Sequence, residues 1–440
     1  MCFGSVRVTV ACGWPEFEGI QHMADERVLA FLREHTSASR RHFVQIGAGA
    51  VAAITATRGN AEQLTDDPRL QSSLQKLESW LTTPDEFRDV SRGKPKPHSL
   101  SPEQRKEAGL TRETWKLNVI SDSEHPARIA NPLEGENGFS FNDLMRLAET
   151  KAVRFPKVMT CLNIGCPLGN GVWEGVPLRD VLWLTQPSEN LRRVFYYGYH
   201  NDDPKQMFRS SLPVGRILED PFDLPPVILC YKLNGQWLTP ERGGPVRVVV
   251  PEAYGFKSIK WLSDVVLSNI PAANDTYAEK NNDVDSPLKT FCATLTTPQD
   301  ASPQQPLPIT GWAQVGISGL SKVQVWITSQ DEKWPDDDPY FQNAPWQDAT
   351  ILPLANDVGG GMPNGKIPPD TLGFDGNGKP VRWPLPLSRV HWCFLHAGMP
   401  AGKYVLRCRT VDARGIAQPM PRPFRKSGHA KIEQVRFDVK

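Results

Sequence analysis

The chain of 440 residues lacks an excess of charge of either sign. Its 50 Lys and Arg residues face 49 Asp and Glu residues, so the formal net charge at pH 7 is +1. A nucleic-acid-binding domain is typically basic or carries a basic stripe, and a solvating tail is typically acidic. The balance therefore argues against nucleic acid as a partner and against an acidic tail.

Long apolar runs are also missing. No apolar stretch reaches the length of about 18 residues that a permanent membrane-spanning helix requires, so the mature protein is expected to have no such span. The eight cysteines are too few and too scattered for a disulfide scaffold. The sequence contains no Cys-x-x-Cys-His motif, so we expect no haem attached to this chain.

The chain is rich in apolar and turn-forming residues. Hydrophobic residues make up 39%, with 13 Trp and 18 Phe, which supports buried cores and excludes global disorder. The 40 Pro and 34 Gly indicate many loops and strands. At roughly 150 residues per domain, this length predicts two or three domains.

Residues 1–61 have the pattern of an export leader. Arg40 and Arg41 precede a weakly apolar stretch over 43–56 that is rich in Gly and Ala. Paired arginines before a mild apolar core resemble the twin-arginine export signal, although the last two positions of the motif differ. A leader that begins at Met23 would be more typical of an export signal, so Met23 is a candidate for the true start of the protein. We therefore expect residues 1–61 to direct export of the protein to the periplasm. The alternative is that the apolar stretch forms a small helix packed on the domain.

Helical and alternating patterns are interspersed over 62–270 and predict a mixed α/β domain. Helices are expected over 70–81, 140–148 and 178–184, and strands over 115–120, 158–162, 193–199, 227–232, 246–250 and 265–268. The glycine-rich segment over 165–171 is interpreted as flexible backbone.

A polar run over 274–285 without apolar periodicity indicates a linker at 271–288. Beyond it the patterns predict only strands, which indicates an immunoglobulin-like sandwich over 289–440. These strands are expected over 309–315, 323–327, 390–395, 402–411 and 434–439. Residues 357–380, rich in glycine and proline, are expected to form a long surface loop.

Cys161 closes the strand expected over 158–162, where a thiolate can reach a metal or a ligand. Cys166 follows closely, so a disulfide or dithiol pair is a second interpretation, and a buried small side chain is a third. A zinc site is poorly supported, because no second cysteine pair or nearby His cluster completes it.

The neighbourhood of Cys161 and five later segments form an ordered set of motifs. They are Thr160-Cys161, Gly169–Leu182, Tyr231–Gly235, Gly244–Pro251, Gly255–Leu262 and Leu406–Pro419. In this order they resemble the sulfite oxidase family of molybdopterin-dependent oxidoreductases, over about residues 85–440. The resemblance implies an α+β protein, with a mixed α/β molybdopterin-binding domain followed by the all-β immunoglobulin-like domain. That second domain serves dimerisation in the family, so a homodimer is expected.

The resemblance also implies roles for individual residues. Cys161 matches the cysteine whose thiolate ligates molybdenum. Arg92, Gly93 and Lys94 fall in a loop that touches substrate and pterin, and Tyr277 is the candidate for an active-site tyrosine. Further positions match contacts to the molybdopterin and its phosphate: His200, Arg242, Arg247, Ser258, Ile259 and Lys260.

The activity implied by the resemblance is oxygen-atom transfer at molybdenum. The expected substrate is sulfite or a related sulfur compound, and the electrons would pass to a separate carrier such as a c-type cytochrome. The family places an arginine shortly after the cysteine, whereas Leu162-Asn163-Ile164 carries no charge, which weakens anion binding. Reduction of a sulfoxide or another oxo substrate is therefore the alternative, and a non-catalytic periplasmic binding or scaffolding protein is the third.

Overall fold

The computed structural model describes residues 67–162, 167–221, 224–285, 287–296, 301–355, 358–419 and 431–440. The predicted leader, with its arginine pair and Met23, lies outside these residues, as does Cys166. Residues Thr65–Lys440 form one compact unit. Within the described ranges each sheet takes its strands from one side of residues 269–290. The predicted domain boundaries themselves stay predictions.

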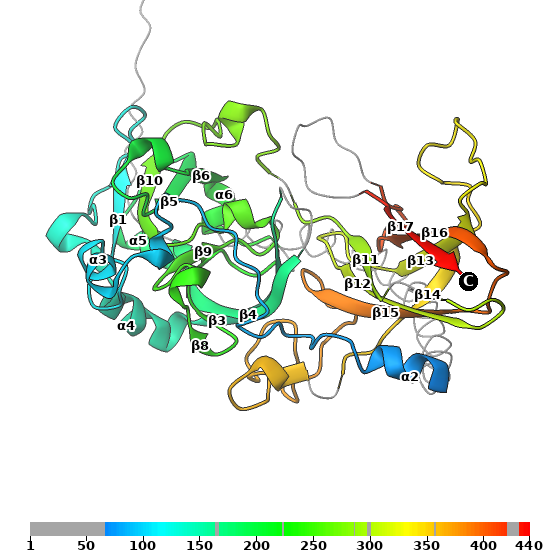
Figure 1. The fold of residues 1–440 in the computed structure, drawn as a ribbon. Coiled ribbons are helices and arrows are strands. Elements are labelled where there is room, and N and C mark those ends of the chain that lie inside the picture. The colour runs from blue at the N-terminus through cyan, green and yellow to red at the C-terminus, as the bar shows by residue number, and fades with distance from the viewer. Residues whose placement is uncertain are drawn as a thin grey trace, which may run out of the picture. The chain divides into compact units, whose positions relative to one another are not determined.

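The first sheet is mixed and has the order β2-β1-β10-β5-β6 (Figure 1). Its central strand, β10, runs parallel to β1 and antiparallel to β5. Leu262, Val265 and Leu267 of β10 are buried, as expected for a central strand with apolar contacts. The strands are β1 (Lys116–Ser121), β2 (Phe139–Ser140), β5 (Arg193–Gly198), β6 (Ser210–Pro213) and β10 (Leu262–Ser268).

The second sheet contains the strand that ends immediately before Cys161. Its order is β3-β4-β7-β8, and β9 also pairs with β7. The strands are β3 (Val153–Thr160), β4 (Pro167–Pro177), β7 (Ile228–Leu233), β8 (Gln236–Trp237) and β9 (Arg247–Val249).

Strand β4 corrects the interpretation of the glycine-rich segment as flexible backbone. Its described part is an antiparallel strand between β3 and β7. Within this segment, a Cβ atom on Gly171 would lie 2.5 Å from a side-chain carbon of Leu233 in β7, so glycine is needed here for the close packing of β4 against β7. The described glycines of the segment thus serve strand packing.

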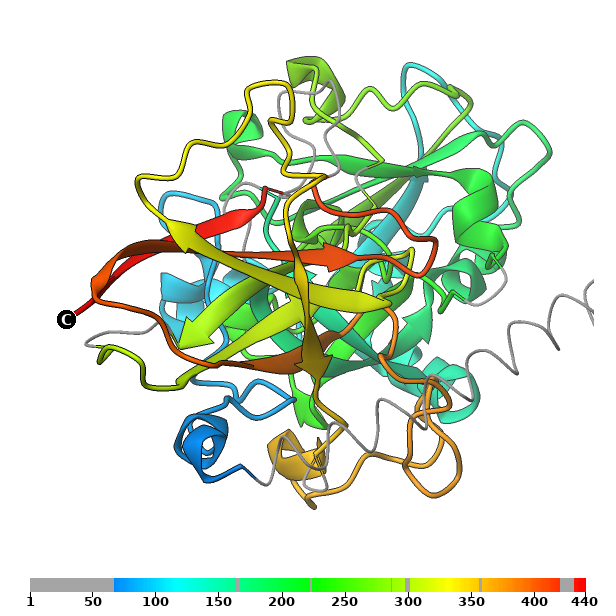
Figure 2. The same cartoon turned by 90° about the vertical axis from the view of Figure 1, so that its right-hand side faces the viewer.

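The third sheet confirms the all-β second half. Its seven strands, all within the described part of the chain, follow the order β11-β12-β15-β14-β13-β16-β17. Because β14 pairs with both β13 and β15, the sheet bends around one hydrophobic cluster as a barrel-like sandwich (Figure 2). The strands are β11 (Phe291–Thr296), β12 (Leu307–Gln314), β13 (Lys322–Ser329), β14 (Gln347–Ile351), β15 (Arg389–His396), β16 (Gly402–Val411) and β17 (Glu433–Val439).

Of the short helices, those that begin at Phe141, Leu178 and Val214 contribute to the core that the first two sheets share, whereas the helix that begins at Pro68 packs against β12 and β15 of the third sheet. The side chain of Ser140 caps the start of α4 by accepting a hydrogen bond from the Asp143 N–H at 3.2 Å, and the Asp143 carboxylate accepts one from the Ser140 N–H at 3.1 Å. This reciprocal capping box fixes the first turn of the helix. The helices are α2 (Pro68–Leu74), α3 (Pro102–Glu107), α4 (Phe141–Lys151), α5 (Leu178–Leu184) and α6 (Val214–Leu218).

The helix expected over 70–81 is shorter than its leucine spacing predicts. Helix α2 ends at Leu74, and the chain after it becomes irregular. Trp80 and Leu81 are buried, and the Trp80 indole N–H donates a hydrogen bond to the Arg389 carbonyl at 2.7 Å. Tertiary contacts with the β-sandwich half therefore override the helical pattern here.

The segment expected as a surface loop is partly buried over its described part, 358–380. Met362 and Phe374 join a hydrophobic cluster with Leu81. The Leu372 N–H donates to the Arg154 carbonyl at 2.8 Å, which attaches the segment to β3. The segment is a loop, as predicted, but Met362, Ile367 and Phe374 are buried rather than at the surface, because irregular backbone can also contribute side chains to a core.

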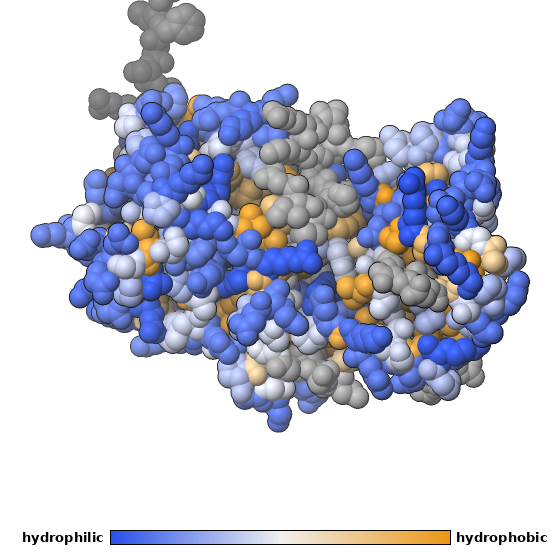
Figure 3. All heavy atoms as spheres, in the orientation of Figure 1, coloured by the Kyte–Doolittle hydropathy of each residue, from blue (hydrophilic) through white to orange (hydrophobic). Residues whose placement is uncertain are grey.

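Within the described residues, no helix has the length and apolar character needed to cross a membrane. The face shown in Figure 3 is mainly hydrophilic, with apolar residues in small patches.

Candidate active site

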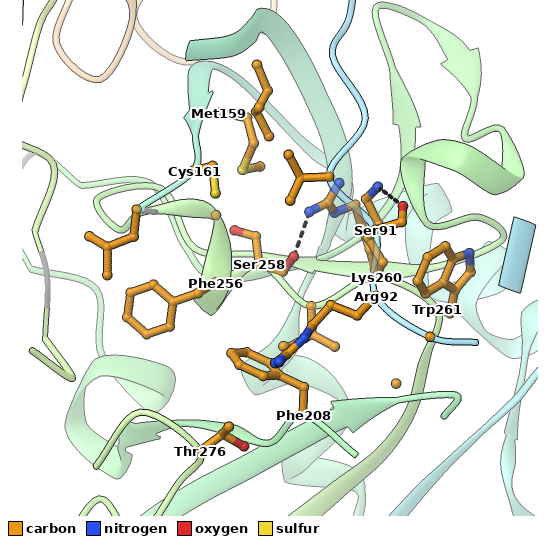
Figure 4. A pocket seen from close by; sticks show the side chains of 18 of the residues that line it. Ser91, Arg92, Met159, Cys161, Phe208, Phe256, Ser258, Lys260, Trp261 and Thr276 are labelled. Carbon is orange, nitrogen blue, oxygen red and sulfur yellow. Dashed lines mark hydrogen bonds between the residues drawn. The ribbon is translucent and has the colours of Figure 1, made fainter. Parts of the chain in front are cut away.

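A cavity of about 270 Å³ opens at the end of β3 (Figure 4). Its walls come from segments that lie far apart in the sequence: residues 87–93, 159–162, 198–200, 206–208, 242–261 and 276–282. The long irregular segment between β9 and β10 supplies much of the lining, as is common for functional sites placed on loops of a rigid scaffold.

The structure brings together almost all residues that the sequence singled out. Those that line the cavity are Arg92, Gly93, Cys161, His200, Arg242, Arg247, Ser258, Ile259, Lys260 and Tyr277. Lys94 is the exception, since it lies outside the lining and is exposed. Its backbone N–H donates a hydrogen bond to the Gln206 side chain at 2.8 Å. The roles assigned to these residues stay predictions.

Cys161 follows the last residue of β3 and is partly exposed. Its thiol is free and points into the cavity beside Met159 (Figure 4). In the described ranges no group of three His, Cys, Asp or Glu side chains could hold a metal ion by itself. A metal bound at Cys161 therefore needs further ligands from another source.

Arg247 forms the buried cationic part of the lining. Its guanidinium donates to the carbonyl oxygens of Arg242 at 2.9 Å and Ser258 at 2.6 Å. Its Nε atom is buried and has no hydrogen-bond partner among the described residues. Burial lowers the pKa of Arg247 to about 10, so the side chain keeps its charge at neutral pH.

Lys260 lies across the cavity from Cys161 (Figure 4). Its ammonium group donates hydrogen bonds to the Asp89 carboxylate at 2.8 Å and the Ser91 hydroxyl at 2.9 Å. Burial lowers the pKa of Lys260 to about 8, and repulsion by Arg247 adds to this effect. Burial would raise the pKa of Asp89, but the hydrogen bonds from Lys260 and Ser91 outweigh it and hold that pKa at about 2.

Asp89 is a residue that sequence reasoning missed. The sequence suggests Lys260 as a free point charge for a phosphate, whereas the structure pairs it with Asp89. The positive charge of this wall therefore comes mainly from Arg242 and Arg247.

An aromatic group close to Cys161 was also missed. The ring of Tyr277 stacks on Phe256 with centroids 4.0 Å apart, and Phe208 meets Tyr277 edge-on at 5.7 Å. The guanidinium of Arg92 lies over Phe208, 4.4 Å from the ring centroid. Phe256 lies within the Gly255–Leu262 motif, so the sequence could have identified it. None of the motifs contains Phe208, so the sequence around it gave no reason to select it.

The polar run at 274–285 places Tyr277 in this group. Asp275, which is fully buried, accepts hydrogen bonds from the Ser211 hydroxyl at 2.9 Å and the Tyr277 N–H at 3.0 Å. These bonds hold the run against β6, although its sequence has no apolar periodicity. Tyr277 is only 7% exposed as a result.

Lys157 in β3 is fully buried beneath the loop that lines the cavity, and its ammonium group donates to the Ala253 carbonyl at 2.8 Å. Burial lowers its pKa to about 7. Between this value and the unfolded value near 10.5, the unfolded chain binds more protons, so stability should rise with pH.

We therefore expect wild type to gain up to about 1.4 kcal/mol per pH unit relative to Lys157→Met between pH 7 and 9. Denaturant unfolding of both proteins at several pH values measures this difference. Parallel stability curves above pH 7 would contradict the buried, easily deprotonated state of Lys157.

The lining fits an anionic cofactor whose metal accepts a thiolate ligand. The Cys161 thiolate is a soft donor, and Arg242 and Arg247 offer positive charge within the same cavity. The unpaired Nε–H of Arg247 indicates an acceptor that the described protein atoms do not provide. The residues present thus match the molybdopterin that the sequence resemblance implies.

Comparison with known proteins agrees with this fit. Residues 111–276 match the family described as the oxidoreductase molybdopterin binding domain. This range contains Cys161 and Lys260 but neither Arg92 nor Tyr277. The chain thus carries a molybdopterin-binding domain of the oxidoreductase type, and molybdopterin is its cofactor.

Curated relatives match a limited part of the chain. Sulfite oxidase of Gallus gallus is 38% identical over 99 residues, which are 22% of this chain and 21% of the relative. The NADH nitrate reductase of Volvox carteri is 31% identical over 115 residues, which are 25% of this chain and 13% of the relative. The match therefore spans about a fifth or less of the length of these relatives.

A solved structure extends the likeness in fold to more of the chain. The sulfane dehydrogenase SoxCD from Paracoccus pantotrophus superposes with a TM-score of 0.52 over 74% of this chain and 76% of that one, at 18% identity. At this identity the likeness concerns the fold. It confirms the mixed domain followed by a barrel-like β-sandwich.

Proposed function

We propose that the protein is an exported molybdenum-cofactor oxidoreductase that oxidises sulfite or a related sulfur compound. The observation that carries the proposal is the free thiol of Cys161 in a cationic cavity of a molybdopterin-binding domain. Among the proteins similar to this chain, sulfite oxidase and the sulfane dehydrogenase SoxCD are named for sulfur substrates, which supports this substrate class.

Oxidation of sulfite adds one oxygen atom from water and releases two protons and two electrons. When bound, molybdopterin supplies a molybdenum centre for such two-electron chemistry. Cys161 would ligate and orient the metal, while Arg242, Arg247 and Lys260 would hold the anionic groups of the cofactor. Among the described residues no carboxylate pairs with Arg92, so its guanidinium is available to a substrate anion.

Other lining residues would complete the site. Gly93, Ser258 and Ile259 lie in the cavity wall and would contact the cofactor. His200, whose Nδ1 lies 3.4 Å from the Gly198 carbonyl, would contact the pterin. Tyr277, held by its stack on Phe256, would face the substrate.

Export and electron transfer are parts of the same proposal. The pattern over 1–61 supports the twin-arginine route to the periplasm. The sequence has no haem-attachment motif, which supports a separate electron carrier, most simply a c-type cytochrome. We further infer a homodimer formed through the β-sandwich.

A second candidate is the reduction of a sulfoxide or another oxo substrate. The apolar and aromatic side chains of Met159, Leu162 and Phe256 surround Cys161 in the cavity. Such a wall suits a neutral organic substrate better than a small anion. The chain after Cys161 also lacks the arginine that would help to bind sulfite.

Purified protein from a host that makes molybdopterin tests the proposal. We expect sulfite-dependent reduction of cytochrome c, and we expect Arg92→Ala to lower kcat/KM for sulfite by about 10- to 100-fold, the value of a charged hydrogen bond. Arg112→Ala is the matched control, because that arginine stacks on Trp237 outside the cavity.

The same protein distinguishes the alternatives. Sulfoxide-dependent oxidation of a reduced dye, without any activity on sulfite, would support the second candidate instead. Absence of molybdenum from protein made in a cofactor-competent host would contradict both enzyme proposals and leave a binding or scaffolding protein.

A further inference from the structure

Two buried polar side chains connect the β-sandwich to the residue before Cys161. The hydroxyl of Thr160, the last residue of β3, donates a hydrogen bond to Oε1 of Gln314 at 2.5 Å. Gln314 is the last residue of β12, and its Nε2 donates to the Lys289 carbonyl at 2.6 Å. Both Thr160 and Gln314 are fully buried, so water does not replace these bonds.

This connection lies where the β3 ladder becomes irregular. The pairing of β3 with β4 shifts in register between Met159 and Thr160, and Cys161 lies outside the strand. Regular backbone pairing therefore does not fix the backbone at Cys161. The Val158 N–H donates to the Leu387 carbonyl at 2.7 Å, so a second bond from the β-sandwich half holds the same strand end.

Gln314 itself does not reach the reacting groups, because it is absent from the described lining of the cavity. Its direct connection to the site is the bond to Thr160, the residue that precedes Cys161. A buried hydrogen bond between neutral groups restricts the side-chain and backbone positions of both partners.

We propose that Gln314 is a positioning residue that holds the Cys161 thiol in the cavity through Thr160. The inference rests on the proposed function, in which Cys161 is the metal ligand. In this arrangement the β-sandwich contributes to the geometry of the cofactor site as well as to any subunit contact. Residues that orient a metal ligand typically affect metal affinity by about 10- to 100-fold.

The test is the near-isosteric substitution Gln314→Leu in the full chain. Its matched control is Gln418→Leu, since Gln418 is also buried and accepts from the Thr410 hydroxyl at 3.1 Å, but within the β-sandwich. In cofactor-free protein we expect Gln314→Leu to raise the alkylation rate of Cys161 several-fold, measured by mass spectrometry. In holoenzyme we expect about tenfold faster loss of molybdenum on dialysis.

Substitutions at Thr160 give a second route if Gln314→Leu does not fold. Thr160→Val keeps the shape and removes the hydroxyl, so it should reproduce both effects, while Thr160→Ser should restore wild-type behaviour. Equal alkylation and metal retention in Thr160→Val, Thr160→Ser and wild type would overturn the inference. A failure of the proposed function would give a different result. The Cys161→Ser variant would then retain molybdenum, regardless of any substitution at Gln314.

Discussion

Replacing Cys161 with serine should lower molybdenum content and turnover by at least about 100-fold, more than the loss of a group that only orients a ligand. A serine hydroxyl stays protonated at neutral pH and is a hard donor, whereas a thiolate is a soft ligand for a transition metal. The hydrogen bond between Thr160 and Gln314 would persist in the variant, so the cavity should keep its shape.

Metal analysis and the sulfite assay together check this result. Cys393→Ala is the control, because Cys393 is a free, buried cysteine of β15 that lies outside the cavity lining. The control should keep its metal and activity. A Cys161→Ser protein with full metal content would show that the thiolate is not the ligand, and the resemblance that assigned it would then be misleading at this position.

Local sequence patterns predicted those elements whose cues lie within a few residues. Helix α5 and strand β16 occur over the residues expected for them, 178–184 and 402–411. In α5, Leu178, Val181 and Leu182 recur at helical spacing and are buried, so pattern and packing agree.

Elements whose stability comes from distant neighbours were missed. Strand β14 (Gln347–Ile351) is mostly polar and has no buried residue, and it is a strand because β13 and β15 pair with it on either side. Strand β4 contains glycines that look like loop residues until the approach of β7 is known. Strand preference depends on such tertiary context, which a short window of sequence does not contain.

The site residues also divide into those with local sequence cues and those whose role depends on distant partners. Cys161, Arg247 and Lys260 could be selected because motifs carry them, and the structure places all three on one cavity. Asp89 and Gln314 could not, because each acts through a partner more than 150 residues away in the chain. The overall charge balance also concealed the local arrangement, since the cavity concentrates cations that acidic residues elsewhere offset.

Gly198→Ala should markedly lower the stability of the protein. Gly198 ends β5, and a Cβ atom there would lie 2.0 Å from the Lys260 carbonyl oxygen and 2.7 Å from that of Trp261. Both contacts are with backbone, so the loop must move as a unit. Overpacking of this kind costs about 1–3 kcal/mol or more.

The displacement should also weaken the cofactor site, because the same loop carries Lys260 and its bond to Asp89. We expect a fall of several degrees in the unfolding temperature, measured by calorimetry, and reduced molybdenum content. Gly215→Ala is the control, since a Cβ atom on Gly215 in α6 meets nothing within 4 Å. That change should be neutral or stabilise by up to about 1 kcal/mol, because alanine favours the helix. If both variants unfolded at the wild-type temperature, β5 and the cavity loop would not be packed as tightly as the structure shows.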